Sequence, residues 1–141
     1  MIRKINRQEL ELLTCKEFDF SDAWNLNMLT SSFDAGRFFA YGYFERDLLV
    51  GFVTYSISVD DADIEDIAVL PSHRRRKIAS ELLKFAEQQL LQLGKKRILL
   101  EVRQNNFPAI NLYTLHGYKN ISVRKKYYAD GVDAIVMAKE L

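Results

Sequence analysis

The sequence has little of several residue types that mark particular protein classes. Cys15 is the only cysteine among 141 residues, so no internal disulfide can form and nothing indicates an oxidising compartment. The two prolines and the lack of Pro-, Gly- or Ser-rich stretches give no sign of a linker. No hydrophobic run approaches the length of a membrane span, and the first residues lack the apolar core of a signal peptide. We therefore expect one cytoplasmic domain over residues 1–141, with no membrane partner.

The chain also lacks an excess of charge of either sign. Its 20 Lys and Arg residues nearly balance 19 Asp and Glu residues, whereas a whole-chain nucleic-acid binder would carry a stronger basic imbalance. His73, His116 and Cys15 show neither metal-ligand spacing nor the arrangement of a nucleophile with its base, so we expect no metal. With 48% hydrophobic residues, a chain of this length can bury roughly two-thirds of its unfolded surface.

Hydrophobic periodicity and turn residues predict the order of elements. Strands are expected over residues 1–5, 37–46, 48–58, 63–70, 96–102, 118–127 and 133–139. Helices are expected over residues 8–18, 78–93 and 107–116, and a further short helix is expected after a cap at Ser21 or Asp22. The strand, helix and strand between residues 63 and 102 form a crossover unit. The predicted fold class is therefore α/β (α+β), with a mixed, largely antiparallel sheet of about seven strands flanked by about four helices.

A basic run follows the fourth of these predicted strands. The strand containing Ile67 ends near Val69, and Arg74-Arg75-Arg76-Lys77 leads directly into the helix that begins near Ile78. The first turn of a helix has N–H groups without intrahelical partners, and the helix dipole adds positive charge at that end. Such a run is often only a solvated surface patch, but here it is also suited to a phosphate-bearing ligand.

Two motifs around this crossover resemble the GNAT superfamily of N-acetyltransferases. Val69-x-Pro71 followed by Arg74-x-x-Lys77-x-Ala79 resembles the family's pyrophosphate loop for acetyl-CoA, whose usual form is (Gln/Arg)-x-x-Gly-x-(Gly/Ala). Asn106-x-x-Ala109-x-x-Leu112-Tyr113-x-x-x-Gly117-Tyr118 resembles the second family segment. The two motifs occur in the family's order and at a suitable separation.

Three further segments resemble, within that superfamily, the ribosomal-protein-alanine N-acetyltransferases, or RimI subfamily. They are Leu100-Glu101-Val102-Arg103-x-x-Asn106, Arg124-x-x-Tyr127-Tyr128 and Asp133-Ala134-x-x-Met137. The resemblance implies transfer of an acetyl group from acetyl-CoA to the N-terminal amine of a protein or peptide by direct attack. It covers about residue 64 to the end of the sequence.

The resemblance also implies roles for individual residues. The strand ending at Ala68 and Val69 would bind the pantetheine arm through its backbone, the loop over residues 74–79 would hold the pyrophosphate, and Asn106 would contact the CoA arm. The expected cofactor-binding residues are Ile67, Ala68, Val69, Arg74, Arg75, Arg76, Lys77, Ile78, Ala79, Asn106 and Tyr113.

Catalysis is expected from Glu101 as general base, through water, and from Tyr113 as the acid that protonates the leaving thiolate. Tyr127, Tyr128 and Glu65 are expected to bind the acceptor, and Glu65 or Asp66 is an alternative base. A phenol with a pKa near 10 stays protonated at about pH 7, as a proton donor must. Taken without the motif, Glu101 would more simply be a strand-edge carboxylate paired with Arg103 or Lys95.

Lys77 is the one residue of the loop that departs from the family pattern, because a glycine usually stands there. A residue with a Cβ reaches glycine-type backbone angles at a cost of about 1 to 3 kcal/mol. Lys77 could keep a helical conformation and add a cation for the phosphates, or it could hinder the cofactor. We expect the first.

Three other functions remain open at this stage. The protein could acetylate a small-molecule amine, or it could be a CoA-binding or interaction module with weak catalysis. A nucleic-acid patch over residues 74–77 ranks last, because 124–126 is the nearest other basic run and the chain is close to neutral. The sequence does not indicate an oligomeric state.

Overall fold

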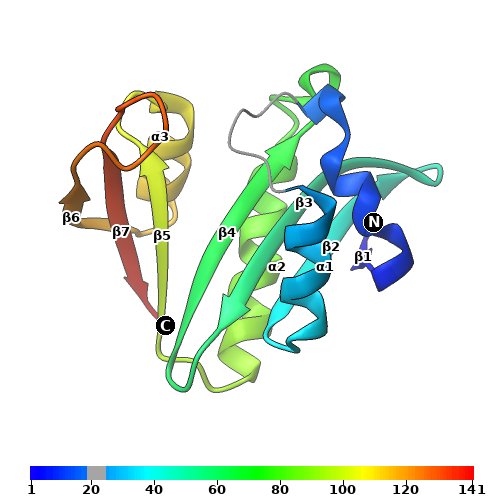
Figure 1. The fold of residues 1–141 in the computed structure, drawn as a ribbon, viewed down its shortest axis with the longest axis horizontal. Coiled ribbons are helices and arrows are strands. Elements are labelled where there is room, and N and C mark those ends of the chain that lie inside the picture. The colour runs from blue at the N-terminus through cyan, green and yellow to red at the C-terminus, as the bar shows by residue number, and fades with distance from the viewer. Residues whose placement is uncertain (19–24) are drawn as a thin grey trace.

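The computed structural model describes residues 1–18 and 25–141, and there seven strands form one sheet in the order β1-β2-β3-β4-β5-β7-β6. Neighbouring strands are antiparallel except β4 and β5, which α2 connects, as predicted (Figure 1). The elements are β1 (Ile2–Lys4), η1 (Arg7–Thr14), η2 (Lys16–Phe18), α1 (Leu26–Asp34), β2 (Phe38–Glu45), β3 (Leu48–Ile57), β4 (Asp61–Val69), η3 (Pro71–His73), α2 (Ile78–Gln92), β5 (Arg97–Arg103), α3 (Phe107–Leu115), β6 (Lys119–Arg124) and β7 (Ala134–Glu140).

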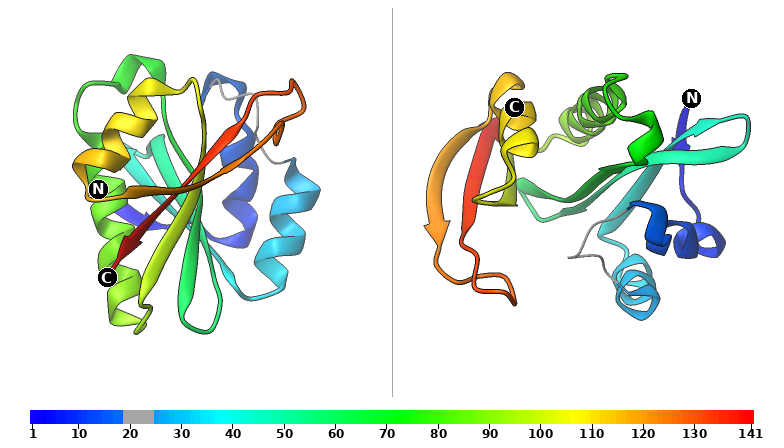
Figure 2. Two further views of the ribbon diagram at one scale, coloured as in Figure 1. Left: turned by 90° about the vertical axis from the view of Figure 1, so that its left-hand side faces the viewer. Right: turned by 90° about the horizontal axis from the view of Figure 1, so that it is seen from above.

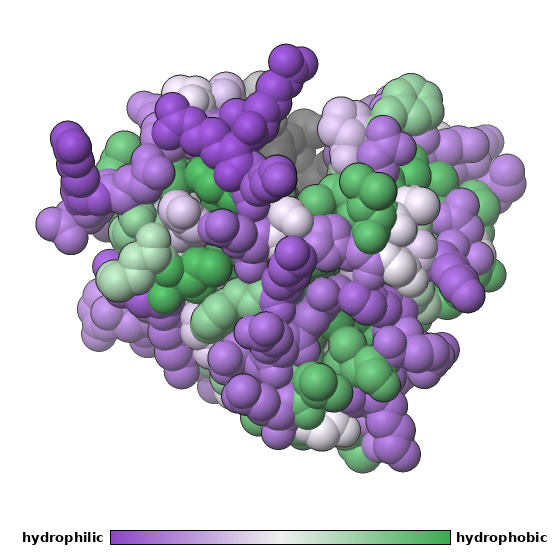
Figure 3. All heavy atoms as spheres, turned by 180° about the vertical axis from the view of Figure 1, so that it is seen from behind, coloured by the Kyte–Doolittle hydropathy of each residue, from purple (hydrophilic) through white to green (hydrophobic). Residues whose placement is uncertain are grey.

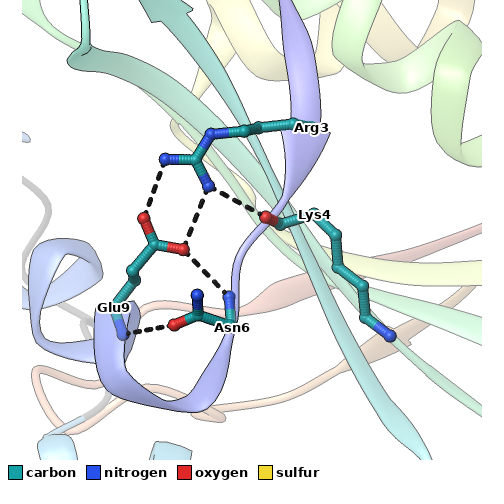
Figure 4. Close-up of polar contacts among 4 residues, drawn as sticks. All are labelled: Arg3, Lys4, Asn6 and Glu9. Atoms are coloured by element: carbon teal, nitrogen blue, oxygen red, sulfur yellow. Dashed lines mark hydrogen bonds and ion pairs between the residues drawn. The ribbon is translucent and has the colours of Figure 1, made fainter.

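The first predicted helix is a 3-10 helix, η1, followed by the single turn η2. A capping box begins it: the Asn6 side chain accepts from the Glu9 N–H, and the Glu9 carboxylate accepts from the Asn6 N–H. Arg3 of β1 binds both Glu9 oxygens at 3.0 and 2.8 Å (Figure 4). The predicted caps Ser21 and Asp22 lie outside the described residues. Among the residues that the structure describes, Asn25 caps α1.

Helices cover both faces of the sheet. α2 and α3 lie on one face, and η1 and α1 lie on the other (Figure 2). β3 is therefore buried along most of its length, which explains its nearly continuous hydrophobic sequence. The outer surface on the side of α2 and α3 is mainly polar, with apolar side chains in small separate groups (Figure 3). None of the helices within 1–18 and 25–141 is long and apolar enough to cross a membrane.

α2 packs unusually close to β3 at the end where α2 begins. A Cβ on Gly51 would lie 3.1 Å from the Ala68 carbonyl oxygen, 3.1 Å from Ile78 and 3.3 Å from Leu82. The absence of a side chain at Gly51 therefore lets the first turn of α2 settle against the end of β4. Ile78, Leu82 and Ala86 follow one another on the buried face of the helix.

The sheet divides between β4 and β5. Only four residue pairs join these strands, from Asp61 with Arg97 to Ile64 with Leu100. Beyond them β4 stays paired with β3, and β5 stays paired with β7. The two groups of strands separate from this point (Figure 1). One half of the molecule then consists of β1 to β4 with α2, and the other of β5, β7 and β6 with α3.

The strand expected over residues 118–127 is shorter than predicted. β6 ends at Arg124, and Lys126 has a φ of 51°. Asp133 holds the turn, because its carboxylate accepts from the Lys126 N–H at 2.8 Å and from the Lys125 ammonium at 3.3 Å. Tyr127 and Tyr128 therefore lie in a loop and not in a strand.

Candidate active site

A cleft of about 1020 Å³ opens where β4 and β5 separate. β4, β5, α3 and the loop after β6 line it. Its lining residues are Asp63, Ile64, Glu65, Asp66, Ile67, Leu99, Leu100, Glu101, Val102, Arg103, Asn106, Ala109, Tyr113, Arg124, Tyr127, Tyr128, Ala129 and Val136. The structure thus brings together seven residues that the sequence predicted for the site: Glu65, Ile67, Glu101, Asn106, Tyr113, Tyr127 and Tyr128.

Glu65 enters the cleft from a bulge in β4. Thr54 of β3 pairs with Asp66 and Tyr55 pairs with Ile64, so Glu65 is an extra residue without a partner on β3. Ser56 donates a hydrogen bond to Glu65 Oε1 at 2.6 Å. Burial raises the pKa of Glu65, the Ser56 hydrogen bond opposes that shift, and the nearby carboxylates Asp63 and Glu101 add to it. A cation in the cleft would relieve this repulsion.

Glu101 has partners that sequence reasoning did not identify. Its Oε1 accepts from Arg124 Nη1 at 3.1 Å, and a hydrogen bond from Tyr127 to its carboxylate is the main reason why the pKa of Tyr127 is raised. The alternative pairing of Glu101 with Arg103 or Lys95 is not observed: Arg103 binds Asp130 at 2.8 Å, and Lys95 donates to the backbone carbonyls of Ser58 and Val59, just after β3. The strand order places β6 near β5 and so supplies Arg124 instead.

Tyr113 lies on the α3 side of the cleft and is 8% exposed to solvent. Burial raises its pKa, and the charges of Asp66 and Tyr128 raise it further. Its hydroxyl therefore stays protonated throughout the neutral range, which suits a proton donor. The α3 N-cap, Asn106, also lines the cleft, with its Oδ1 accepting from the Ala109 N–H at 3.3 Å.

Tyr127 and Tyr128 are held against one another and against arginines. Their rings meet edge to face at 5.1 Å. The Arg124 guanidinium lies 5.0 Å from the Tyr127 ring centroid, and that of Arg103 lies 4.2 Å from the Tyr128 centroid. The loop thus forms an aromatic wall of the cleft, in which Tyr127 is 49% exposed.

The basic loop follows the end of β4 and lies beyond the cleft. The lining of the cleft therefore does not include several predicted cofactor-binding residues, namely Ala68, Val69 and residues 74–79. Arg74 Nε donates to the Val69 carbonyl at 3.2 Å, and Arg76 lies 3.8 Å from the Glu45 carboxylate. Ile78 is 3% exposed, so its side chain belongs to the core and only its backbone faces the loop.

Lys77 takes the backbone conformation expected of the glycine that it replaces. Its φ of 63° and ψ of 19° are left-handed, and it is the N-cap of α2. The expectation that Lys77 stays in a right-handed helical conformation is therefore wrong. Arg75 also has a positive φ, 64°. Among the described residues, neither Arg75 nor Lys77 forms an ion pair, so both cations face solvent near the first turn of α2.

Sequence reasoning missed several residues of the cleft. Asp63 alternates with Glu65 along β4, and this spacing of two residues could have placed both on one face. Burial raises the pKa of Asp63, and the charges of Glu101 and Asp61 add to the shift. Arg124 precedes Tyr127 in the segment that was noted for its resemblance. No sequence signal indicated its pairing with Glu101, because that contact depends on the order of strands.

Comparison with curated proteins identifies relatives over much of the chain. An N-alpha-acetyltransferase of Saccharolobus solfataricus is 43% identical over 79 residues, which are 55% of this chain and 47% of the relative. A [ribosomal protein bS18]-alanine N-acetyltransferase of Haemophilus ducreyi is 32% identical over 119 residues, 82% of this chain and 81% of the relative. The chain spans about half the length of two archaeal relatives that it matches: the alignments cover 47% of one and 50% of the other.

Solved structures and family models lead to the same grouping. The crystal structure of the ribosomal-protein-S18-alanine N-acetyltransferase from Escherichia coli matches with a TM-score of 0.90 and 26% identity, over 99% of this chain and 92% of that one. The model of the acetyltransferase (GNAT) family matches residues 4–118. The resemblance noted from the motifs is thereby confirmed, and the chain belongs to the acetyltransferase (GNAT) family.

Proposed function

We propose that this protein transfers an acetyl group from acetyl-CoA to the N-terminal α-amino group of a protein, in the cytoplasm. The observation that carries the proposal is the cleft between β4 and β5, which Glu101 of β5, Tyr113 of α3 and the exposed Tyr127 all line. Two curated relatives that align over 120 and 119 residues carry names that specify ribosomal protein bS18 as the acceptor. A ribosomal protein is therefore the acceptor class that we test first.

The residues present fit acetyl-CoA. Within residues 1–18 and 25–141, no strand pairs with the cleft side of β4 beyond Ile64, so an extended arm can lie along that edge. At the end of β4, the left-handed Arg75 and Lys77 shape a loop before the first turn of α2. The side chains of Arg75 and Lys77 and the N–H groups of residues 78 and 79 would hold the pyrophosphate. Asn106 would contact the arm between these two places.

Acetyl-CoA supplies the acetyl group as an activated thioester, and the chain's own residues manage the protons. Glu101, whose carboxylate Arg124 contacts at 3.1 Å, accepts a proton from the acceptor amine through water. Tyr113 Oη donates a proton to the departing sulfur. Glu65 and Asp63 attract the amine as a cation before it loses that proton. Presenting a neutral α-amine near pH 7 costs roughly 1 kcal/mol, against over 4 kcal/mol for a lysine side chain, so a water-linked carboxylate is adequate for an N-terminus.

The test is acetylation of a peptide library in the presence of acetyl-CoA, read by mass spectrometry. The library contains peptides beginning with alanine, including the N-terminal sequence of ribosomal protein bS18, and matched peptides with a blocked N-terminus and an internal lysine. We expect acetylation of free N-termini only. Acetylation of small amines with none of peptides would replace this proposal with a small-molecule enzyme. Binding of acetyl-CoA in calorimetry without any turnover would replace it with a CoA-binding module.

A further inference from the structure

The two halves of the divided sheet meet again through a small polar cluster on the side of α2 and α3. Glu87 of α2 accepts with one oxygen, Oε2, from the Tyr118 hydroxyl at 2.9 Å and from the Lys139 ammonium at 3.0 Å. Tyr118 follows α3, and Lys139 belongs to β7, so both donors come from the half opposite to Glu87. We call Glu87, Tyr118 and Lys139 the clasp. Beside it, Ser80 Oγ and His116 Nε2 lie 2.7 Å apart and join the same two helices.

The clasp is largely removed from water. The side chains of Glu87 and Lys139 are 11% and 28% exposed, and Tyr118 is 2% exposed. Burying a polar side chain is costly unless it is hydrogen-bonded, so the contacts of Glu87 with Tyr118 and Lys139 stabilise this arrangement. The Lys139 ammonium also lies 5.7 Å from the Tyr118 ring centroid. The cluster therefore has one favourable arrangement, which fixes α2 relative to the end of α3.

Tyr118 in turn holds Tyr113. Their rings meet edge to face at 5.7 Å. The Tyr113 carbonyl accepts from the Tyr118 N–H at 3.0 Å and from the His116 N–H at 3.1 Å. Ring and backbone of Tyr113 thus both depend on the segment that Glu87 binds. Only four residue pairs join β4 to β5, at the far end of the cleft, so the clasp is a second attachment, on the side where Tyr113 lies.

We propose that Glu87 is a positioning residue for acetyl transfer: through the Tyr118 hydroxyl, it fixes Tyr113 relative to the edge of β4. The proposal rests on the role proposed for Tyr113 as proton donor. A proton donor acts only within hydrogen-bonding reach of the reacting atom, and a displacement of about 1 Å can reduce the rate roughly 100-fold.

The decisive variant is Tyr118→Phe, which removes the hydroxyl and keeps the ring. We expect kcat to fall about tenfold, while KM for acetyl-CoA and for the acceptor peptide changes less than about twofold. The matched control is Tyr43→Phe. Tyr43 of β2 lies beside Glu81, also on α2, and burial followed by the charge of Glu81 raises its pKa. That pair lies within one half of the molecule, so kcat should not change. Equal losses in both variants would overturn the proposal.

A double-mutant cycle separates positioning from general stability. In a Tyr113→Phe background, Tyr118→Phe should lower kcat by less than about twofold, because the group that it positions is already absent. A full tenfold loss in that background would show that Tyr118 acts elsewhere and would refute the inference. Glu87→Gln keeps one side-chain oxygen as a hydrogen-bond acceptor and loses the charge. Its loss of kcat should be smaller than that of the double variant Tyr118→Phe with Lys139→Met, which removes both donors to Glu87. Tyr118→Phe alone decides the matter if the Glu87 variant does not fold.

The same measurements distinguish this inference from the proposed function. If Tyr113→Phe alone retains the wild-type kcat, Tyr113 is not the proton donor, and both proposals about it fail. If Tyr113→Phe lowers kcat and Tyr118→Phe does not, only the positioning role of Glu87 fails.

Discussion

The two ends of β4 differ in charge. Toward the cleft, the strand and its neighbours contribute Asp63, Glu65, Asp66 and Glu101, and the pKa values of Asp63 and Glu65 are raised by burial and by neighbouring carboxylates. After its last residue, the chain continues into the basic run from 74 to 77. Arg103 and Arg124 also line the cleft, but carboxylates outnumber them there, so charge is unevenly distributed along one strand of a protein with a net charge of +1.

This polarisation matches the two partners that the proposed reaction requires. Acetyl-CoA is an anion because of its phosphates, and an N-terminal amine arrives as a cation. The basic end attracts the first and the acidic end attracts the second, while each end repels the other partner. Net charge alone conceals this division, because the opposing charges cancel in the total. Substitutions at one end at a time test this division.

The largest effect is expected at the acidic end, from Glu101→Gln. Loss of the base should lower kcat about 100-fold near pH 7, within the usual range for general base catalysis. The deficit should shrink above about pH 9, because the α-amine is then already neutral. A pH-rate profile of the variant with an N-terminal peptide measures this. An unchanged profile would remove Glu101 from the role of base and leave it as a partner of Arg124.

At the basic end, Lys77→Glu should weaken acetyl-CoA binding about tenfold at low salt. The change replaces a cation near the proposed pyrophosphate site with an anion, and added salt should reduce the difference. Calorimetry at two ionic strengths measures both. The affinity for the acceptor peptide should stay within about twofold. Equal weakening of the two ligands would contradict the division into two ends.

Lys77→Gly separates backbone strain from charge at the same position. A left-handed conformation costs a non-glycine residue roughly 1 to 2 kcal/mol, and the greater freedom of glycine in the unfolded chain offsets part of the gain. We expect the free energy of unfolding to rise by about 0.5 to 1 kcal/mol. Lys77→Ala keeps the strain, and its stability should not exceed that of the wild type. Denaturant titration of the two variants tests whether the φ of 63° is strained.

The smallest effect is expected from Glu65→Gln. The folded protein holds the Glu65 proton more tightly than the unfolded chain does, so the charged form reduces stability once the pH exceeds the ordinary glutamate value near 4.5. The variant should therefore be more stable than the wild type at pH 7, by about 0.5 kcal/mol after allowance for solvent screening, and equal to it near pH 4. Thermal unfolding at both pH values measures this. Glu11→Gln, on the exposed side of η1, should have no effect at either pH.

The order of elements and seven residues of the cleft could be predicted from the sequence, for identifiable reasons. The buried face of α2 repeats at helical spacing from Ile78 to Leu90, and Gly117 with its φ of 91° ends α3 as expected. These signals are local. The same is true of the turn at residues 45–47, where Arg46 and Asp47 take positive φ angles between two strands.

What could not be predicted depends on contacts between distant residues. Arg124 reaches Glu101 only because β7 lies between β5 and β6 and brings their ends together. The early end of β6 depends on Asp133, which binds the Lys126 N–H. The left-handed angles of Arg75 and Lys77 are intrinsically unfavourable, so only the surrounding structure can impose them. The 3-10 form of η1 likewise depends on contacts that hydrophobic spacing does not record.

The separation of β4 from β5 creates a sheet edge inside the molecule. An open edge offers N–H and C=O groups on which a strand of another chain can add, and extended edges of this kind lead to aggregation. Here the edge is short, is interrupted by the bulge at Glu65, and carries acidic side chains on a recessed wall. These are the features by which proteins protect exposed edges. The carboxylates that we propose to receive the acceptor therefore also help to keep the protein from assembling with itself along β4.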